Sequence, residues 1–172
     1  MSNEIVSSFT AASLREVLLQ KGYRAEIVAD AAGVPQIRSA TNGLSFILRF
    51  GNRLGGAADA YLDAVLTTAL QGLGAATAAA IDQWNASKRF ARLHRSGELL
   101  FLEMDLSVIG GVTRSHLDAQ IEIWDRMVQE LINYVRTVLA PAAARDSQSA
   151  AFAGGGALTT PQRADSPALS GV

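Results

Sequence analysis

Cysteine is absent from the 172-residue sequence, aromatic residues are scarce, and positive and negative charges nearly cancel. The absence of cysteine excludes disulfides, thiolate nucleophiles and cysteine-ligated metal sites. Fifteen Lys and Arg residues stand against sixteen Asp and Glu residues, which gives a net charge of -1. This balance provides no basic excess to hold a nucleic acid or an anionic membrane. We therefore expect neither a nucleic-acid partner nor a membrane partner.

A long uninterrupted hydrophobic run is also missing. Residues 60–81 form the most apolar stretch, but Asp63 and Gln71 interrupt it, and Gly72 and Gly74 break it. A membrane-spanning helix needs about 20 predominantly apolar residues without such breaks. The first residues are polar and carry no basic segment before an apolar core, as a secretory signal would. We expect a cytoplasmic protein.

Hydrophobic residues nevertheless make up 49% of the chain and charged residues 18%, which is enough apolar surface for one folded domain. We place this domain at residues 1–139. Residues 140–172 are mostly Ala, Gly, Ser, Pro and Thr. They cannot bury enough apolar surface to offset about 1–2 kcal/mol of backbone entropy per residue. We therefore predict a disordered tail.

Hydrophobic periodicity and turn residues predict an α+β domain with antiparallel strands. Thr10 is suited to cap the first helix and Gly22 to end it, while Asn42-Gly43 is typical of a tight hairpin. Thr113 is suited to cap the last helix. The predicted helices span residues 11–21, 75–88 and 114–138, and the predicted strands span 23–29, 36–41, 44–50, 61–70, 90–95 and 98–107.

The last helix carries an apolar stripe from Leu117 to Val138 with alternating spacings of four and three residues. Such a stripe is compatible with a coiled-coil seam or with a helix that covers a sheet. We favour the second interpretation, because amphipathic strands need a cover. Self-association stays open, since small sheet-and-helix domains often bury an apolar face against a second copy.

Two patterns bear on small-molecule chemistry. The turn over residues 72–77 lies between a predicted strand and a predicted helix, as in a dinucleotide-binding fingerprint. It lacks the third glycine, and an antiparallel hairpin follows where a parallel crossover is needed. His94 and His116 are the only histidines and have no spacing typical of metal ligands. We therefore predict no cofactor, no metal site and no catalytic residue.

A basic cluster occupies residues 88–95. It could bind an acidic partner or a phosphate, or its members could pair within the sheet. A two-residue turn at residues 96–97 would place Arg92 diagonal to Glu103, close enough for an ion pair. We favour pairing for Arg92 and leave Arg89 open.

Two blocks of sequence carry a family resemblance. Residues 82–93 read DQWNASKRFARL, which resembles the Asn-x-Trp-Asn-x-x-x-Arg-Phe-Ala-Arg signature of the YbjN family. Residues 102–106 and 110–113 read LEMDL and GGVT, which are similar to the family's second block. The chain departs from the pattern at Asp82, where the family commonly has Asn, and at Arg114 and His116, where acidic residues are common. The resemblance covers about residues 5–139.

The resemblance implies a twisted antiparallel sheet of about five to six strands with three helices, like the type III secretion chaperones, and commonly a homodimer. The family is described as bacterial sensory-transduction regulators, with no reaction attached. We therefore expect a non-enzymatic regulatory or chaperone-like protein-binding module. The alternative is a small-ligand or nucleotide sensor that uses residues 72–77 with Arg89. The signature residues are Trp84, Asn85, Arg89, Phe90, Arg92, Met104, Asp105, Gly110 and Gly111.

These signature residues also have physical roles that need no ligand. Trp84 is suited to anchor the second helix, and Asn85 to hydrogen-bond backbone near the end of that helix. Phe90 would insert from the first residue of the next strand. Gly110 and Gly111 would let the chain leave the sheet and enter the last helix. We therefore favour a role in specifying the fold over a ligand site.

Overall fold

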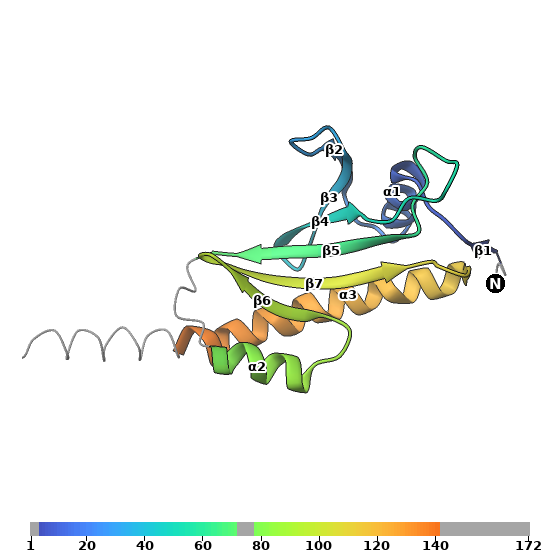
Figure 1. Cartoon of the computed structure of the whole chain (residues 1–172). Coiled ribbons are helices and arrows are strands. Elements are labelled where there is room, and N and C mark those ends of the chain that lie inside the picture. The colour runs from blue at the N-terminus through green and yellow to red at the C-terminus, as the bar shows by residue number, and fades with distance from the viewer. Residues whose placement is uncertain (1–3, 72–77, 142–172) are drawn as a thin grey trace, which may run out of the picture.

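Six antiparallel strands form one sheet, with helices packed on one face and against one edge, in the computed structural model (Figure 1). The structure describes residues 4–71 and 78–141. The strand order is β2-β3-β4-β5-β7-β6, and β1 pairs with β8 in a separate two-stranded ladder. This confirms the predicted α+β class. The elements are β1 Ile5–Val6, α1 Ala11–Gln20, β2 Ala25–Ala29, β3 Pro35–Thr41, β4 Leu44–Phe50, β5 Asp63–Leu70, α2 Ala78–Ser87, β6 Arg92–Ser96, β7 Leu99–Ser107, β8 Val112–Thr113, α3 Arg114–Tyr134 and a π-helical turn Val135–Leu139.

The predicted helix caps are confirmed. The Thr10 side chain accepts a hydrogen bond from the backbone N–H of Ser13, and the Ser13 hydroxyl accepts one from the N–H of Thr10. This reciprocal pair satisfies two N–H groups that the first turn of α1 leaves without a helical partner. Gly22 follows the helix with a φ of 86°. Thr113 caps α3 by accepting from the N–H of His116.

The hydrophobic core lies between α1, α3 and the inner face of the sheet. Ile37, Leu48, Leu66 and Met104 lie side by side in register on four neighbouring strands, and all four are buried. Fully burying a side chain of this size contributes about 1.5–3 kcal/mol. The stripe of α3 covers this row and confirms the helix-on-sheet interpretation; its buried members are Leu117, Ile121, Trp124, Met127, Val128 and Leu131.

The hairpin between β6 and β7 turns one residue later than the sequence predicted. Ser96 pairs with Leu99, so Gly97 and Glu98 form the turn, with Gly97 at a φ of 57°. This register places Arg92 directly opposite Glu103 rather than diagonal to it. The inward and outward faces are unchanged, because the register moved by an even number of residues.

Several strand boundaries also differ from the prediction, and β2 begins at Ala25 rather than at residue 23. The strand predicted over 61–70 begins at Asp63, because Tyr61 instead forms isolated bridges with Phe9 and Arg53. The strand predicted from Phe90 begins at Arg92. The predictions for residues 72–77 and for most of the tail fall outside the described residues. None of the described helices is long and apolar enough to cross a membrane.

Candidate functional site

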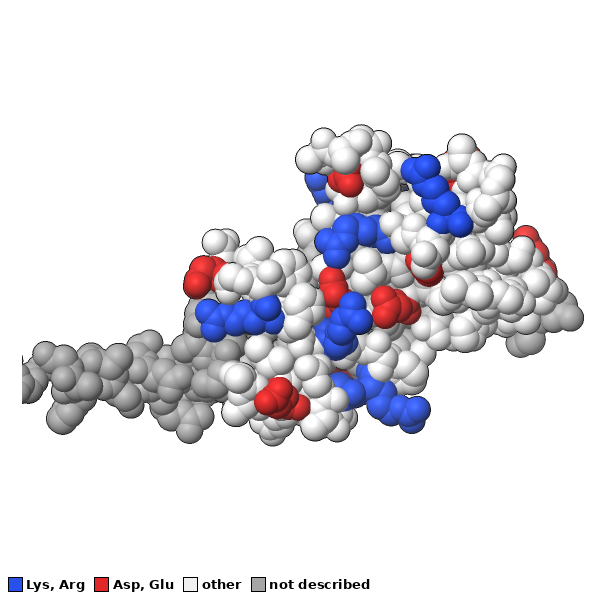
Figure 2. All heavy atoms as spheres, viewed as in Figure 1, with Lys and Arg blue, Asp and Glu red and all other residues white. Residues whose placement is uncertain are grey.

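The outer face of the sheet carries none of the described helices, and we call it the open face. Side chains on it alternate with those of the core along each strand. Arg38, Ile47, Thr67, Glu103 and Arg92 lie side by side in register from β3 to β6. Figure 2 shows basic and acidic side chains gathered over the strands in the middle of the molecule. The open face is therefore polar at its centre.

Glu103 is the centre of this polar group. Its Oε1 lies 3.0 Å from Nη2 of Arg49, and its Oε2 lies 3.0 Å from Nη2 of Arg92 and 3.1 Å from Nε2 of His94. The Thr67 hydroxyl donates to Oε1 at 3.3 Å. Only 12% of the Glu103 side chain is exposed. The pairing that the sequence favoured for Arg92 is thus confirmed.

The cations around Glu103 change the pKa of its carboxyl group. Partial burial alone would raise the pKa, but hydrogen bonds and charge from Arg92 and His94 outweigh it and lower the pKa below its ordinary value. The carboxylate therefore stays ionised and neutralises the cations around it. It is the centre of an ion-pair group on the open face.

Trp84 and Asn85 close the outer edge of β6. The Asn85 side chain donates to the carbonyl of Leu93 at 2.8 Å and accepts from its N–H at 2.8 Å. The indole N–H of Trp84, a buried residue, donates to the carbonyl of Ala91 at 3.1 Å. An unpaired strand edge is a template for adding another strand. Here two side chains of α2 occupy these edge groups and tie the helix to β6.

Phe90 does not insert into the core, contrary to the sequence prediction. Its φ is 73°, and 58% of the residue is exposed. The N–H of Ala91 donates to the carbonyl of Arg89 at 2.9 Å, so Phe90 is the centre of a γ-turn with positive φ. Such a conformation costs a bulky residue on the order of 1–3 kcal/mol. The edge bonds of Trp84 and Asn85 hold the chain on both sides of this turn.

Charged side chains surround the exposed ring. The Arg89 guanidinium lies 5.5 Å from the Phe90 ring centroid and forms no ion pair with any residue that the structure describes. Lys88 pairs with Glu130 at 2.6 Å. A hollow of about 290 Å³ opens here. We call this region the signature corner; its hollow is lined by Asn85, Lys88, Phe90, Ala91, Arg92, Glu103 and Asp105.

The remaining signature residues lie in the core, on the open face and in the turn before α3. Met104 is buried beneath the sheet, while Asp105 lies on the open face, 3.7 Å from Nη1 of Arg92. Gly110 and Gly111 have φ values of 81° and 83° and shape the turn before α3, where the N–H of Gly111 bonds the carbonyl of Val108. The two glycines lie outside the signature corner, whereas Asp105 lines its hollow.

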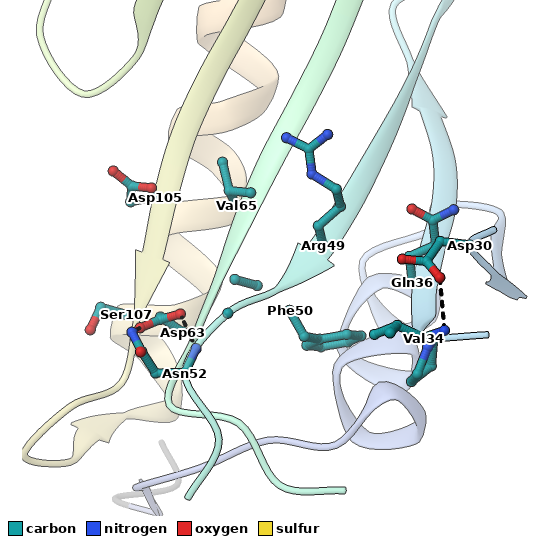
Figure 3. A pocket seen from close by; sticks show the side chains of 13 residues that line it. Asp30, Val34, Gln36, Arg49, Phe50, Asn52, Asp63, Val65, Asp105 and Ser107 are labelled. Atoms are coloured by element: carbon teal, nitrogen blue, oxygen red, sulfur yellow. Dashed lines mark hydrogen bonds between the residues drawn. The ribbon is translucent and has the colours of Figure 1, made fainter. Parts of the chain in front are cut away.

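A larger hollow of about 530 Å³ lies where β4 and β7 end and β5 begins, opposite the turn between β2 and β3 (Figure 3). Its polar groups are largely satisfied within the chain. The Asp63 carboxylate accepts from the backbone N–H of Asn52 at 2.9 Å and from Nδ2 of Asn52 at 2.6 Å. A side chain at Gly51 would collide with Asp63, since a Cβ there would lie 2.0 Å from Oδ1. The polar groups of this hollow therefore hold the chain after β4 against the start of β5.

Two members of the site were missed from the sequence. Arg49 joins the Glu103 group through the pairings of β4 with β5 and of β5 with β7, and His94 joins it through the pairing of β6 with β7. For Arg49, a period of two gives the face but cannot give the order of strands in the sheet. His116 lies exposed in the first turn of α3. Within residues 4–71 and 78–141, no three His, Asp or Glu side chains are grouped to hold a metal ion.

The fold and the site define a small α+β domain with one face of its sheet left open beside an exposed aromatic corner. The family model described as "Putative bacterial sensory transduction regulator" matches residues 10–137, and the chain belongs to this family, YbjN. No curated protein and no solved structure matches the chain. Membership supports a regulatory role.

Proposed function

We propose that the protein is a non-catalytic regulatory module that binds a partner protein on its open face, with Phe90 as the anchor. One observation carries this proposal. A large aromatic ring is held in solvent by a strained γ-turn, although a fold-specifying aromatic would gain by burial. Strained backbone of this kind persists where the surroundings enforce it, and it clusters at functional sites.

The chemistry of the corner fits a protein partner. Exposed aromatic and Arg side chains are enriched among residues that dominate binding energy in protein interfaces. Phe90 and Arg89 provide such a pair, beside a hollow that can receive a side chain from the partner. Strand addition at β6 is disfavoured, because Asn85 occupies both backbone groups of Leu93. We therefore propose a chaperone-like mode in which the partner packs on the face.

Site-specific photo-crosslinking in the native host tests the proposal. With p-benzoylphenylalanine at position 90, we expect an adduct with a discrete protein that mass spectrometry identifies. Position 109 is the matched control, because Ile109 is also a large exposed apolar residue, at 62% exposure. Absence of an adduct at position 90, or the same adducts at both positions, would contradict the proposal.

A second measurement separates binding from folding. With the crosslinker at position 105, on the rim of the same hollow, Phe90→Gly should reduce the adduct yield severalfold, whereas Ile109→Gly should not. Glycine accepts positive φ, so Phe90→Gly should leave the free energy of unfolding unchanged or raise it by up to about 1 kcal/mol. Loss of stability together with loss of the adduct would indicate a purely structural role for Phe90.

A further inference from the structure

The middle of the open face contains a third hollow, of about 360 Å³, next to the Glu103 group. Three small residues, Ser45, Thr67 and Ala69, lie in it on two neighbouring strands, β4 and β5. A depression forms there because the neighbouring side chains are longer. Those longer neighbours are Arg38, Ile47, Arg49 and Phe101.

The charge beside this hollow is positive and only partly neutralised. Arg49 is already bound by Glu103. Arg38 lies directly opposite Glu26 in the register of β2 and β3. Nevertheless, the Arg38 guanidinium has no ion-pair or hydrogen-bond partner within residues 4–71 and 78–141. Arg38 lines the hollow, and its guanidinium provides an unused set of donors, which suits a carboxylate.

We propose that this central hollow receives an aliphatic side chain of the partner protein, and that Arg38 pairs with a carboxylate beside that side chain. This inference rests on the proposed function and names the chemistry of the partner. Ile47 and the ring of Phe101 supply apolar walls, and the Arg38 stem adds methylene groups. A basic partner segment is disfavoured, because two arginines border the same hollow.

A free small molecule fits this hollow less well than a segment of protein. Small-ligand pockets bury about 70–90% of the ligand surface. Ala69 is exposed, so the hollow is too open to enclose a ligand in that way. A protein segment needs no enclosure, because its other contacts extend over the open face toward the signature corner. The Arg92 side chain belongs to both the Glu103 group and the corner and connects the two regions.

Nuclear magnetic resonance titration of the full chain tests the inference with two synthetic peptides. One is acetyl-GELELELG-amide, and the other is its charge-reversed counterpart, acetyl-GKLKLKLG-amide. We expect the acidic peptide to shift the amide signals of Arg38, Ala69 and Phe101 at concentrations where the basic peptide does not. Equal shifts with both peptides, or equal shifts with octanoate at the same concentration, would overturn the inference.

Two variants and one control define the position of the site. Ala69→Trp fills the hollow and should weaken binding of the acidic peptide at least tenfold. Ser96→Trp, at an exposed position on β6 outside the hollow, should leave binding unchanged. Arg38→Glu should reverse the preference toward the basic peptide. Unchanged binding in Ala69→Trp would also overturn the inference.

The outcome distinguishes this inference from the proposed function. If the acidic peptide shifts only signals around Phe90, the corner binds and the central hollow does not, so the inference alone fails. If neither peptide shifts any signal of the open face and position 90 gives no adduct, both fail.

Discussion

A single side chain, that of Asn85, occupies both backbone groups that Leu93 directs away from the sheet. The sequence allowed a hydrogen bond from Asn85 to nearby backbone, since Asn competes for such groups near helix ends. It could not name Leu93, because that contact needs α2 to lie along the edge of β6. The signature therefore combines an edge clamp, Trp84 and Asn85, with an exposed group, Arg89 and Phe90. The clamp restrains the strained turn that exposes the ring.

Removal of the Asn85 amide should lower the free energy of unfolding more than substitutions on a helix surface usually do. Asn85→Ala leaves the N–H and the carbonyl of Leu93 without their partner, and we expect a loss of about 1–3 kcal/mol in the free energy of unfolding. Asn85→Asp keeps the acceptor for the N–H but sets a carboxylate against the carbonyl, so it should not restore stability. Urea denaturation measures both. Asp82→Ala, at an exposed position on the same helix, is the control and should change stability by less than about 0.5 kcal/mol. Equal effects at positions 82 and 85 would contradict the clamp.

At the scale of elements, helix caps, turns and apolar stripes could be predicted from nearby residues, whereas the pairing of strands was predicted less well. Caps at Thr10 and Thr113, the Asn42-Gly43 hairpin and the stripe of α3 follow from spacing and turn residues, and all are confirmed. The turn after β6 was misplaced by one residue because both Ser96-Gly97 and Gly97-Glu98 contain the glycine. β1 and β8 were missed because two-residue strands have no readable period.

The homodimer stays a prediction, and the structure narrows the surfaces that could form it. The stripe of α3 is buried within the chain, so a dimer would need another face. β2 lies at the edge of the sheet and carries Ile27, which is 42% exposed.

The turn from β7 into α3 offers a test of how β1 is held. A Cβ at Gly111 would lie 3.0 Å from Cγ2 of Ile5, whereas a Cβ at Gly110 would meet nothing within 4 Å. Both glycines have positive φ, so each Ala substitution should cost about 1 kcal/mol through backbone strain. We expect Gly111→Ala to lower the free energy of unfolding more than Gly110→Ala does. Adding Ile5→Ala to Gly111→Ala should remove this difference. The double-mutant cycle is measured by chemical denaturation; identical costs at both glycines would contradict the contact.

At the scale of the whole molecule, Asp125 on α3 connects the helix to the start of the sheet. Its Oδ1 accepts from the Tyr23 hydroxyl at 3.3 Å and from the side chains of Thr41 and Asn42. Burial, together with the charge and hydrogen bond of Asp125, raises the pKa of Tyr23 to about 12. A raised pKa stabilises the folded state fully below the ordinary value of 10, and that stabilisation is lost as pH rises toward 12.

Tyr23→Phe should therefore lower the free energy of unfolding at pH 8 by roughly 1 kcal/mol, the size of one hydrogen bond. The free energy of unfolding of this variant should also decline less steeply between pH 9 and 11 than that of the wild type, because the phenol with the raised pKa is gone. Urea denaturation across this range measures both effects. A variant that declines as steeply as the wild type would show that Tyr23 does not contribute to the alkaline loss.

Glu103 joins four strands, because its carboxylate on β7 contacts Thr67 on β5, Arg49 on β4, and Arg92 and His94 on β6. The contact with Arg92 was predicted, since both residues lie within one hairpin, whereas Arg49 reaches Glu103 across β5. The pKa of Glu103 is lowered from its ordinary value of 4.5, so its stabilising effect is complete above pH 4.5 and is lost as pH falls through the lower folded value.

Glu103→Gln should lower stability at neutral pH, because it leaves the cations around position 103 without their shared anion. The same variant should lose less stability than the wild type as pH falls below 4.5, since its amide has no proton to take up. Glu98→Gln is the control; its side chain is 82% exposed and lies 3.8 Å from Arg95 in the hairpin turn. Denaturation at pH 3 to 7 measures both variants. If Glu103→Gln matched Glu98→Gln across this range, the Glu103 group would be a surface cluster without a role in joining the sheet.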